Sequence, residues 1–192
     1  MYKVVLKATT LAHDIVKKVV VDGDCVVDAT LGNGNDTIFL NSLTPNGIVY
    51  SFEVQKHAVD KFRSLIEEKK LKNIEVIHDG HENMDKYIKT KVKAIMFNLG
   101  YLPGSDKTVT TKSDTTLKAV EKGLNILSPG GIMTIAAYIG HDEGEKEAEE
   151  VVKYVSQLDS KCYSIMKINF INRKNAPFLI VIEKNDNLRE DI

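Results

Sequence analysis

The chain has 192 residues; 43% of them are hydrophobic, 28% are charged, and the formal net charge is −1. This length and composition predict one soluble globular domain, residues 1–192, and exclude a disordered or fibrous chain. The near-neutral charge also excludes attraction of RNA by the molecule as a whole, so any RNA contact must come from a local basic patch.

Membrane and metal-binding functions are not expected either. No apolar run approaches the roughly 18 residues that a membrane span needs, and the N-terminal residues lack the apolar core of an export signal, so we expect a cytoplasmic protein. Cys25 and Cys162 are expected to be buried thiols, since two cysteines make no disulfide framework. Without a Cys-x-x-Cys pair, and with five scattered histidines, the sequence predicts no metal site.

The predicted elements alternate between short β-branched runs and amphipathic stretches. Strands are predicted at 25–30, 48–53, 73–78, 92–99, 131–139, 163–171 and 177–183, and helices at about 9–21, 37–43, 56–70, 81–90, 115–127 and 141–158, with a tail at about 185–192. The last two strands are too close in sequence for a crossover helix and should form an antiparallel hairpin. The pattern predicts a three-layer α/β domain with a mostly parallel seven-stranded sheet, in which ligands bind beyond the carboxyl ends of the strands.

The strongest motif is DATLGNGND, residues 28–36, which leads from the first strand into a helix. Gly32 and Gly34 would let ligand atoms approach the backbone, although a plain strand-to-helix turn is an alternative. A dinucleotide fingerprint requires a third glycine or alanine where this chain has Thr37. Asp28 is poorly placed beside a pyrophosphate and better suited to the cationic S-adenosylmethionine. The glycine turn alone does not decide between these cofactors.

Two later strand ends indicate a nucleoside ligand. Glu53 lies 21 residues after Gly32, where a carboxylate can accept hydrogen bonds from both ribose hydroxyls of NAD or of S-adenosylmethionine. Val54 or Gln55 could flank the adenine. Asp79 could accept a hydrogen bond from the adenine amino group or, equally, cap the following helix.

The motif NLGYLPG, residues 98–104, ends the fourth strand. The side-chain oxygen of Asn98 and the next backbone carbonyl could both accept protons from one amine and so aim its lone pair at an electrophile. Tyr101 could stack on a planar base. An ordinary loop that turns at Pro103 is the alternative. Nothing in this motif resembles a hydride-transfer site, which disfavours NAD.

Together, DATLGNGNDT, FEVQ, HDGHENM and NLGYLPG resemble the class I S-adenosylmethionine-dependent methyltransferases. More narrowly, residues 8–184 resemble a small bacterial family labelled "putative rRNA methylase", whose members act as tRNA methyltransferases on 5-aminomethyl-2-thiouridine at the anticodon wobble position. The resemblance implies a Rossmann-like fold, S-adenosylmethionine as cofactor and tRNA, through its anticodon loop, as partner.

Site residues follow from the same resemblance. It implies that the cofactor is bound by Asp28, Gly32, Asn33, Gly34, Asn35, Asp36, Glu53, Asp79 and His81, and Gln55 is added to this set because it could flank the adenine. It implies that the acceptor is faced by Asn98, Leu99, Gly100, Tyr101 and Pro103. In the common amino-methyltransferase tetrad two prolines stand where this chain has Leu99 and Gly100. The loop is therefore less rigid, which is compatible with an aminomethyl group on a flexible arm.

The proton acceptor and the RNA contacts are assigned as hypotheses. A protonated alkylamine must lose a proton before it attacks the methyl group, and His141, Asp106 or a water relay are the candidates. Phosphate contacts are expected from Lys107, Lys112, Arg173 and Lys174. The competing functions are an rRNA or small-molecule N-methyltransferase of the same fold, a non-enzymatic nucleotide-binding module, and an NAD-dependent oxidoreductase. A homodimer is compatible with the sequence.

Overall fold

The computed structural model describes residues 3–100, 111–140 and 142–187, and the side chains of residues 142 and 143 are not described. Its strands are β1 (Cys25–Asp28), β2 (Ile48–Phe52), β3 (Ile74–Ile77), β4 (Val92–Leu99), β5 (Leu127–Ala137), β6 (Tyr163–Ile168) and β7 (Phe178–Lys184). Its helices are α1 (Ala8–Val16), α2 (Asn35–Leu43), α3 (Lys56–Lys69), the 3₁₀ turn η1 (His81–Asn83), α4 (Met84–Tyr87), α5 (Ser113–Ile126) and α6 (Asp142–Val155).

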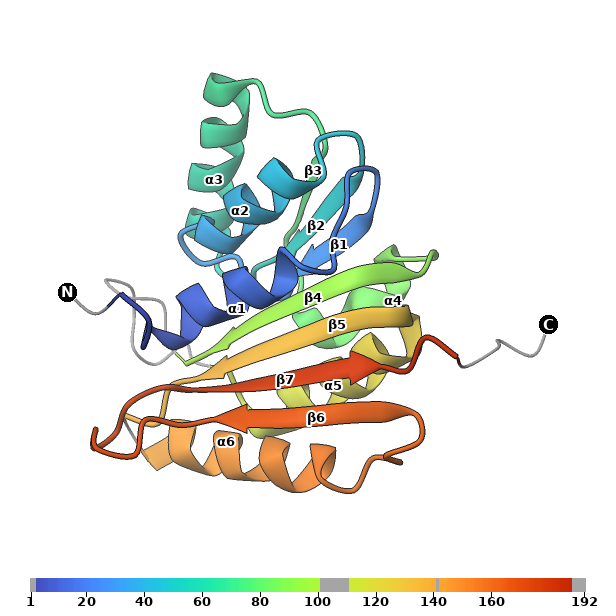
Figure 1. Cartoon of the computed structure of the whole chain (residues 1–192). Helices are drawn as coiled ribbons and strands as arrows, with labels where there is room; N and C mark the ends of the chain where they lie inside the picture. The colour runs from blue at the N-terminus through green and yellow to red at the C-terminus, as the bar shows by residue number, and fades with distance from the viewer. Residues whose placement is uncertain (1–2, 101–110, 141, 188–192) are drawn as a thin grey trace.

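The seven strands form one sheet in the order β3-β2-β1-β4-β5-β7-β6 (Figure 1). The first five strands in the chain pair in parallel, and β7 lies antiparallel between β5 and β6. The predicted α/β class and terminal hairpin are confirmed. Because the chain moves outward from β1 in one direction and then from β4 in the other, the loops after β1 and β4 separate and leave a crevice between them.

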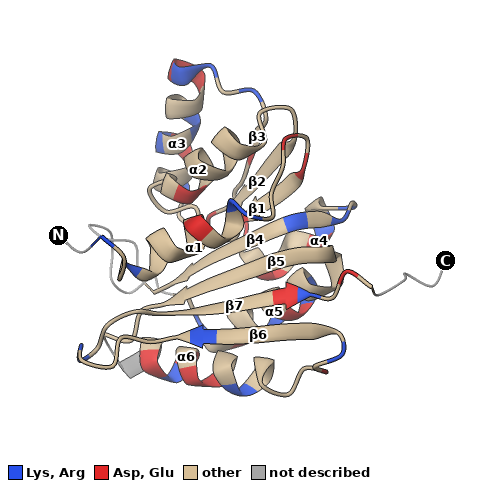
Figure 2. Ribbon diagram, viewed as in Figure 1, with Lys and Arg blue, Asp and Glu red and all other residues tan. Residues whose placement is uncertain are grey.

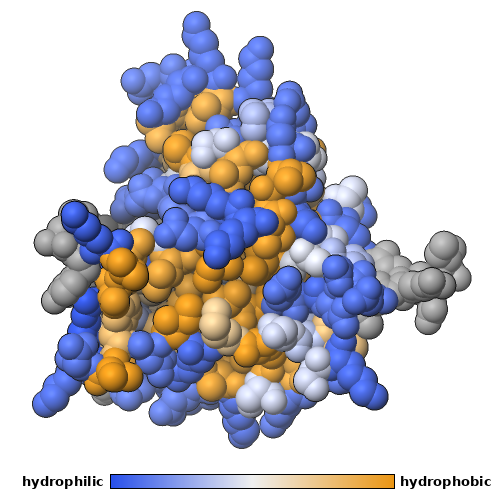
Figure 3. Space-filling model, viewed as in Figure 1, coloured by the Kyte–Doolittle hydropathy of each residue, from blue (hydrophilic) through white to orange (hydrophobic). Residues whose placement is uncertain are grey.

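The central strand β4 shows how the core is divided between the two faces of the sheet. Ile95 and Phe97 pack into one apolar cluster with α4, α5 and α6, whereas Ala94 and Met96 pack into the other with α1 and α2. Side chains alternate across a strand, so a strand covered on both faces needs a continuous apolar run, as 92–99 has. Helix α1 covers only part of its face, and apolar side chains are visible beside it over β5 and β7 (Figure 3).

Several predicted boundaries are wrong, and three of them are instructive. Helix α1 ends at Val16 instead of extending to 21, because the next turn is tightened by backbone bonds such as Val19 N to Val16 O and the chain then reaches Gly23, at φ 93°. The helix predicted at 81–90 is only η1 followed by the four-residue α4. The strand predicted at 131–139 is β5, which begins at Leu127 and ends at Ala137, and its pairing with β4 shifts register between Val92 and Ala94.

No helix in the described part of the chain is long and apolar enough to cross a membrane. The single-domain boundaries, the cytoplasmic location and the homodimer stay predictions.

Candidate functional site

A cavity of about 810 Å³ opens at the carboxyl edge of the sheet, where the loops after β1 and β4 diverge. Its wall is formed by Thr9, His13, Ala29, Thr30, Leu31, Gly32, Asn33, Asn35, Asp36, Phe52, Glu53, Val54, Gln55, Asp79, Gly80, His81, Glu82, Asn98, Leu99, Gly100, Thr111, Lys112, Thr115 and Tyr138. The structure therefore brings together most of the predicted cofactor residues and the described part of the acceptor motif.

The two motif glycines serve different purposes. Both adopt left-handed backbone conformations, with φ of 50° at Gly32 and 78° at Gly34. Gly32 lies in the cavity wall, where a missing side chain leaves room for a ligand. Gly34 is not part of the wall, and a Cβ there would overlap the ring of Phe62 on α3. Gly34 is thus required for packing of α3 against the loop.

Asp28 lies beneath the loop and is completely buried, away from the cavity wall. Its carboxylate accepts hydrogen bonds from Thr37 Oγ1 at 2.6 Å and from the backbone N–H of Thr30 at 3.0 Å. Burial, with the negative charge of Asp36 adding to it, raises the pKa of Asp28 to about 7. The structure places Asp28 as an anchor of the loop, in contrast to the expected position around the cofactor.

Glu53 closes β2 with its carboxylate fixed at the cavity. One oxygen accepts a hydrogen bond from Gly32 N at 3.0 Å and the other from Gln55 N at 2.9 Å. A carboxylate has about four acceptor positions, so two remain for ligand hydroxyls. The bond to Gly32 also links the ends of β1 and β2, and this fixes the distance between the glycine loop and the carboxylate.

Asp79 and His81 form the third side of the cavity. Asp79 is desolvated, but hydrogen bonds from Tyr87 Oη, Asn83 Nδ2 and the Gly80 N–H outweigh this and lower its pKa. Burial lowers the pKa of His81, so its ring is neutral, and Nδ1 donates to the carbonyl of Ala29 at 3.1 Å. This leaves the lone pair on Nε2 of His81. Gly80 is the residue that precedes η1, and no side chain caps this turn, so Asp79 is not the helix cap that the sequence offered as one interpretation; its role at the adenine stays a prediction.

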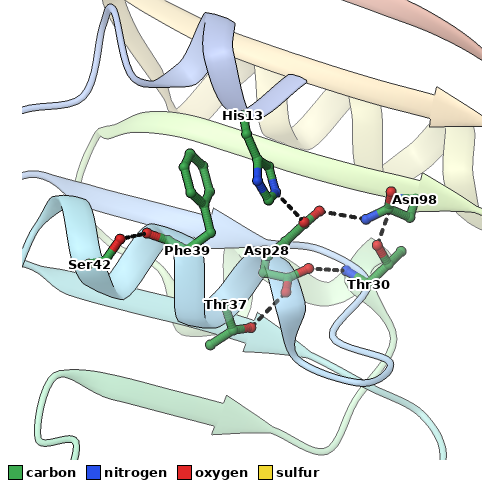
Figure 4. A network of polar contacts seen from close by, with 8 residues as sticks. His13, Asp28, Thr30, Thr37, Phe39, Ser42 and Asn98 are labelled. Carbon is green, nitrogen blue, oxygen red and sulfur yellow. Dashed lines mark hydrogen bonds and ion pairs between the residues drawn. The ribbon is translucent and has the colours of Figure 1, made fainter. Parts of the chain in front are cut away.

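Asn98 occupies the acceptor side through a chain of hydrogen bonds (Figure 4). Its Nδ2 donates to Asp36 at 2.6 Å, and the other oxygen of Asp36 is 2.7 Å from His13 Nε2. The backbone N–H of Asn98 donates to Thr30 Oγ1 at 2.7 Å. Neither His13 nor Thr30 was predicted from the sequence as a site residue. His13 lies among the apolar residues of α1, and Thr30 lies in a motif that was interpreted through its glycines.

Tyr138, just after β5, is a further residue that sequence reasoning missed. It lies in the cavity wall, and burial raises its pKa, with the charge of Asp36 adding to the effect. A raised pKa keeps the phenol protonated and able to donate a hydrogen bond. Its position depends on the pairing of β5 with β4, and no local sequence pattern predicts that pairing.

The loop that follows β4 is held at both described ends by α6. The N–H of Gly100 donates to Thr111 Oγ1 at 3.0 Å, and this hydroxyl donates to Glu147 at 2.6 Å. Thr116 of α5 donates to the other oxygen of Glu147, also at 2.6 Å, and Glu147 is only 2% exposed. Leu99, Gly100 and Lys112 reach the cavity as expected. The predicted Tyr101, Pro103, Asp106, Lys107 and His141 lie outside the described residues.

The remaining predicted RNA contacts, Arg173 and Lys174, lie in the turn between β6 and β7, at the same edge of the sheet (Figures 1 and 2). They do not line the cavity. Arg173 stacks over Phe170 at 4.4 Å and borders a second cavity, of about 420 Å³, beneath α6.

Cys25 and Cys162 are free thiols without a disulfide bond, and both are half-buried. Burial raises the pKa of Cys25. Among the described residues, no three His, Cys, Asp or Glu side chains are grouped so that they could hold a metal ion.

Comparisons with known proteins show which sequences and folds the chain is similar to. Residues 49–184 match the family described as "Putative rRNA methylase". The tRNA (mnm(5)s(2)U34)-methyltransferase, chloroplastic, of Arabidopsis thaliana is 36% identical over 94% of this chain and 70% of its own length. A Clostridium thermocellum protein described in the same words as the family is 42% identical, with a TM-score of 0.92 over 95% of this chain and all of its own. A Streptococcus mutans protein solved in complex with SAH is 39% identical, with a TM-score of 0.87 over 96% of this chain and 99% of its own.

Proposed function

The chain belongs to the "Putative rRNA methylase" family and is an S-adenosylmethionine-dependent methyltransferase, and from that premise we propose that it methylates the amine of 5-aminomethyl-2-thiouridine at the wobble position of tRNA. The product would be 5-methylaminomethyl-2-thiouridine. The name of the Arabidopsis relative, which is 36% identical, supports this acceptor. The cavity supports the methyl donor, because its donor side combines an open glycine loop with a fixed carboxylate.

We assign the donor to the side of the cavity formed by the loops after β1, β2 and β3. Gly32, Asn33 and Asn35 would surround the methionine part, and Glu53 would accept hydrogen bonds from the ribose hydroxyls. Asp79 and His81 would lie near the adenine, with Gln55 beside it. When bound, S-adenosylmethionine supplies an activated methyl group, so the protein has to provide position and a route for a proton.

The observation that carries the amine acceptor is the orientation of the Asn98 amide. Because its Nδ2 is used in a hydrogen bond to Asp36, its Oδ1 is left to accept a hydrogen bond from the substrate. An amine can donate one proton to this oxygen and another to the backbone carbonyl that follows, which directs its lone pair away from both. A hydroxyl acceptor has a single proton and cannot be held in this way.

Charge and atoms balance in the proposed reaction. The substrate ammonium first loses one proton, and the lone pair of the nitrogen then forms a bond to the methyl carbon as the carbon–sulfur bond breaks. The electron pair of that bond remains on sulfur, and the product is a secondary ammonium. His141 and Asp106 stay candidates for the proton acceptor, alongside water.

On the RNA side, we propose that the anticodon loop lies across the carboxyl edge of the sheet. Wobble uridine is single-stranded, so stacking and phosphate contacts should dominate recognition. Lys112 is in the cavity wall, and the 172–175 turn, with Arg173 and Lys174, lies at the same edge. Lys107 and Tyr101, which lie outside the described residues, stay predicted RNA contacts.

Mass spectrometry of tRNA nucleosides from cells that lack the protein tests the acceptor. We expect the unmethylated aminomethyl nucleoside to accumulate and the methylaminomethyl product to vanish. Transfer of a labelled methyl group by the purified protein to rRNA or to a metabolite extract, and not to tRNA, would favour the competing methyltransferase functions. Thermal stabilisation by a nicotinamide dinucleotide, and not by S-adenosylmethionine, would contradict the donor assignment.

A further inference from the structure

We propose that Asp36 and His13 are positioning residues that hold the Asn98 side chain with its oxygen toward the acceptor amine. This inference rests on the proposed amine acceptor and adds to it the device that selects such an acceptor. It assigns a new role to His13 and moves Asp36 from the donor side of the cavity to the acceptor side.

The argument begins with the direction of the two hydrogen bonds. An ionised carboxylate only accepts hydrogen bonds, whereas a carboxamide has one donating and one accepting end. Asp36 Oδ2 is 2.6 Å from the Asn98 amide, so the end of Asn98 that faces Asp36 must be its NH₂ group. The oxygen of the amide is therefore turned away from Asp36. Rotation of the amide by 180° would bring two oxygens together, which is unfavourable in a partly buried site.

His13 holds the carboxylate from the opposite side. Its Nε2 is 2.7 Å from Asp36 Oδ1, where a ring N–H donates to the carboxylate whether the ring is neutral or protonated. The ring also stacks on Phe39 with centroids 3.8 Å apart and planes within 2° of parallel. Phe39 and Asp36 both belong to α2, so a single helix fixes both the plane of the His13 ring and the carboxylate that it contacts.

Burial and charge are consistent with this role. Asp36 is 7% exposed and lies in the first turn of α2, where the positive end of the helix dipole favours a negative charge. The groups around it are the His13 ring, the Asn98 amide, Asp28 and the phenol of Tyr138. These described groups include no lysine or arginine, so the carboxylate depends on its hydrogen bonds to His13 and Asn98 for its orientation.

Exchange of the two side chains tests the direction of the hydrogen bond. Asp36→Asn removes the constraint on the amide, and Asn98→Asp places two carboxylates against each other; we expect each to lower kcat by about 100-fold. The double variant, Asp36→Asn with Asn98→Asp, restores one donor and one acceptor and leaves an oxygen toward the amine. We expect it to recover at least about tenfold over either single variant.

The assay runs from pH 7 to pH 10 with the purified tRNA that carries the aminomethyl nucleoside, because a carboxylate at position 98 would retain the substrate proton to higher pH. Affinity for S-adenosylmethionine, measured by calorimetry, should stay within about threefold of the parent in all three variants. A double variant that is no better than the worse single one across this pH range would overturn the proposal, as would losses of donor affinity that parallel the losses of kcat.

The role of His13 is tested by comparing a substitution that keeps a hydrogen-bond donor with one that removes it. His13→Gln keeps an N–H donor and should retain kcat within about threefold, whereas His13→Leu should lose about tenfold with little change in KM for tRNA. His57→Leu, on the exposed side of α3, is the matched control and should leave kcat unchanged. Equal losses in the Gln and Leu variants would indicate a packing role and contradict the proposal.

An NMR measurement separates failure of this inference from failure of the proposed function. The Nδ2 protons of Asn98, assigned through their absence in Asn98→Asp, should show the shift of a carboxylate-bound amide and should move in Asp36→Asn. This readout needs no acceptor substrate. If wild-type protein does not methylate the tRNA but the shift behaves as expected, the substrate assignment fails and the positioning of Asn98 stands. An Asn98 amide that does not respond to Asp36→Asn overturns the positioning.

Discussion

The donor and acceptor sides of the cavity are built in different ways. On the donor side, Glu53 bonds to Gln55 two residues away and to Gly32 21 residues away, and His81 bonds to Ala29 across 52 residues. On the acceptor side, Asn98 bonds to Asp36 and Thr30 across 62 and 68 residues. The donor residues lie in short segments with a recognisable pattern, whereas the acceptor side is joined by the longer of these contacts and depends on how distant elements pack.

The two sides share residues of one segment. Thr30 and Asp36 flank the glycine turn that we assign to the donor, yet both contact Asn98 on the acceptor side. Their hydrogen bonds fix the end of β4 relative to the start of α2. The comparison can be tested by asking whether substitutions on one side change donor affinity and substitutions on the other change only turnover.

The largest effect is expected from Asn98→Ala. Removal of the group that holds the acceptor nitrogen should lower kcat by about 100-fold, while donor affinity should stay within about twofold. Single-turnover kinetics on tRNA measure the methyl-transfer rate, and calorimetry with S-adenosylmethionine measures the donor affinity. Asn125→Ala, at an exposed position of α5, is the control. Equal losses in both quantities would mean that Asn98 serves the donor and not the acceptor.

The complementary change on the donor side is Glu53→Gln. It replaces a charged acceptor of two ribose hydroxyls with a neutral amide, and loss of charged hydrogen bonds of about 1.5–3 kcal/mol weakens donor binding by about 10- to 100-fold. Calorimetry measures the Kd, and Glu75→Gln on the exposed side of β3 controls for loss of charge. A normal Kd in Glu53→Gln would remove the ribose assignment.

Beneath the donor loop, Asp28 should make stability depend on pH. Its folded pKa of about 7 is above its ordinary value of 3.8, so the native state binds more protons than the unfolded state between these pH values. Stability must then fall as pH rises from about 4 to about 7, by up to about 1.4 kcal/mol per pH unit from this group. Asp28→Asn imitates the protonated form and should flatten this fall in urea denaturation at pH 5, 6, 7 and 8. Parallel curves for the two proteins would contradict the assignment.

The smallest effect concerns the RNA surface, which lies outside both sides of the cavity. Arg173→Ala should weaken tRNA binding by a few-fold and lower the slope of log K against log salt by about one, as expected for one lost phosphate contact. Lys69→Ala, at the end of α3 distant from the cavity edge, is the control. Unchanged tRNA affinity and slope would exclude the β6–β7 turn from the RNA surface.

The order of strands and helices was predicted well from apolar residues, because in this chain a run of them has one role, burial in the core. The continuous apolar run of β4 and the alternation of strands and helices predicted the sheet, because a strand buried on both faces needs such a run. The prediction of site residues was weaker, because glycine and aspartate can serve either ligand binding or packing and hydrogen bonding within the fold. Gly34 and Asp28 belong to a ligand-binding motif, yet the structure uses one to accommodate Phe62 and the other to anchor a turn.

Local pattern thus fixed the class of fold, the family and the loops in which ligands should be sought, since glycines, strand-end carboxylates and hydrophobic periodicity act over a few residues. The joining of His13, Asp36 and Asn98 could not be read in this way. It requires α1 to pack on the face of the sheet formed by β4, β5 and β7 and β4 to pair with β1, and such contacts arise from packing between segments that are distant in the chain.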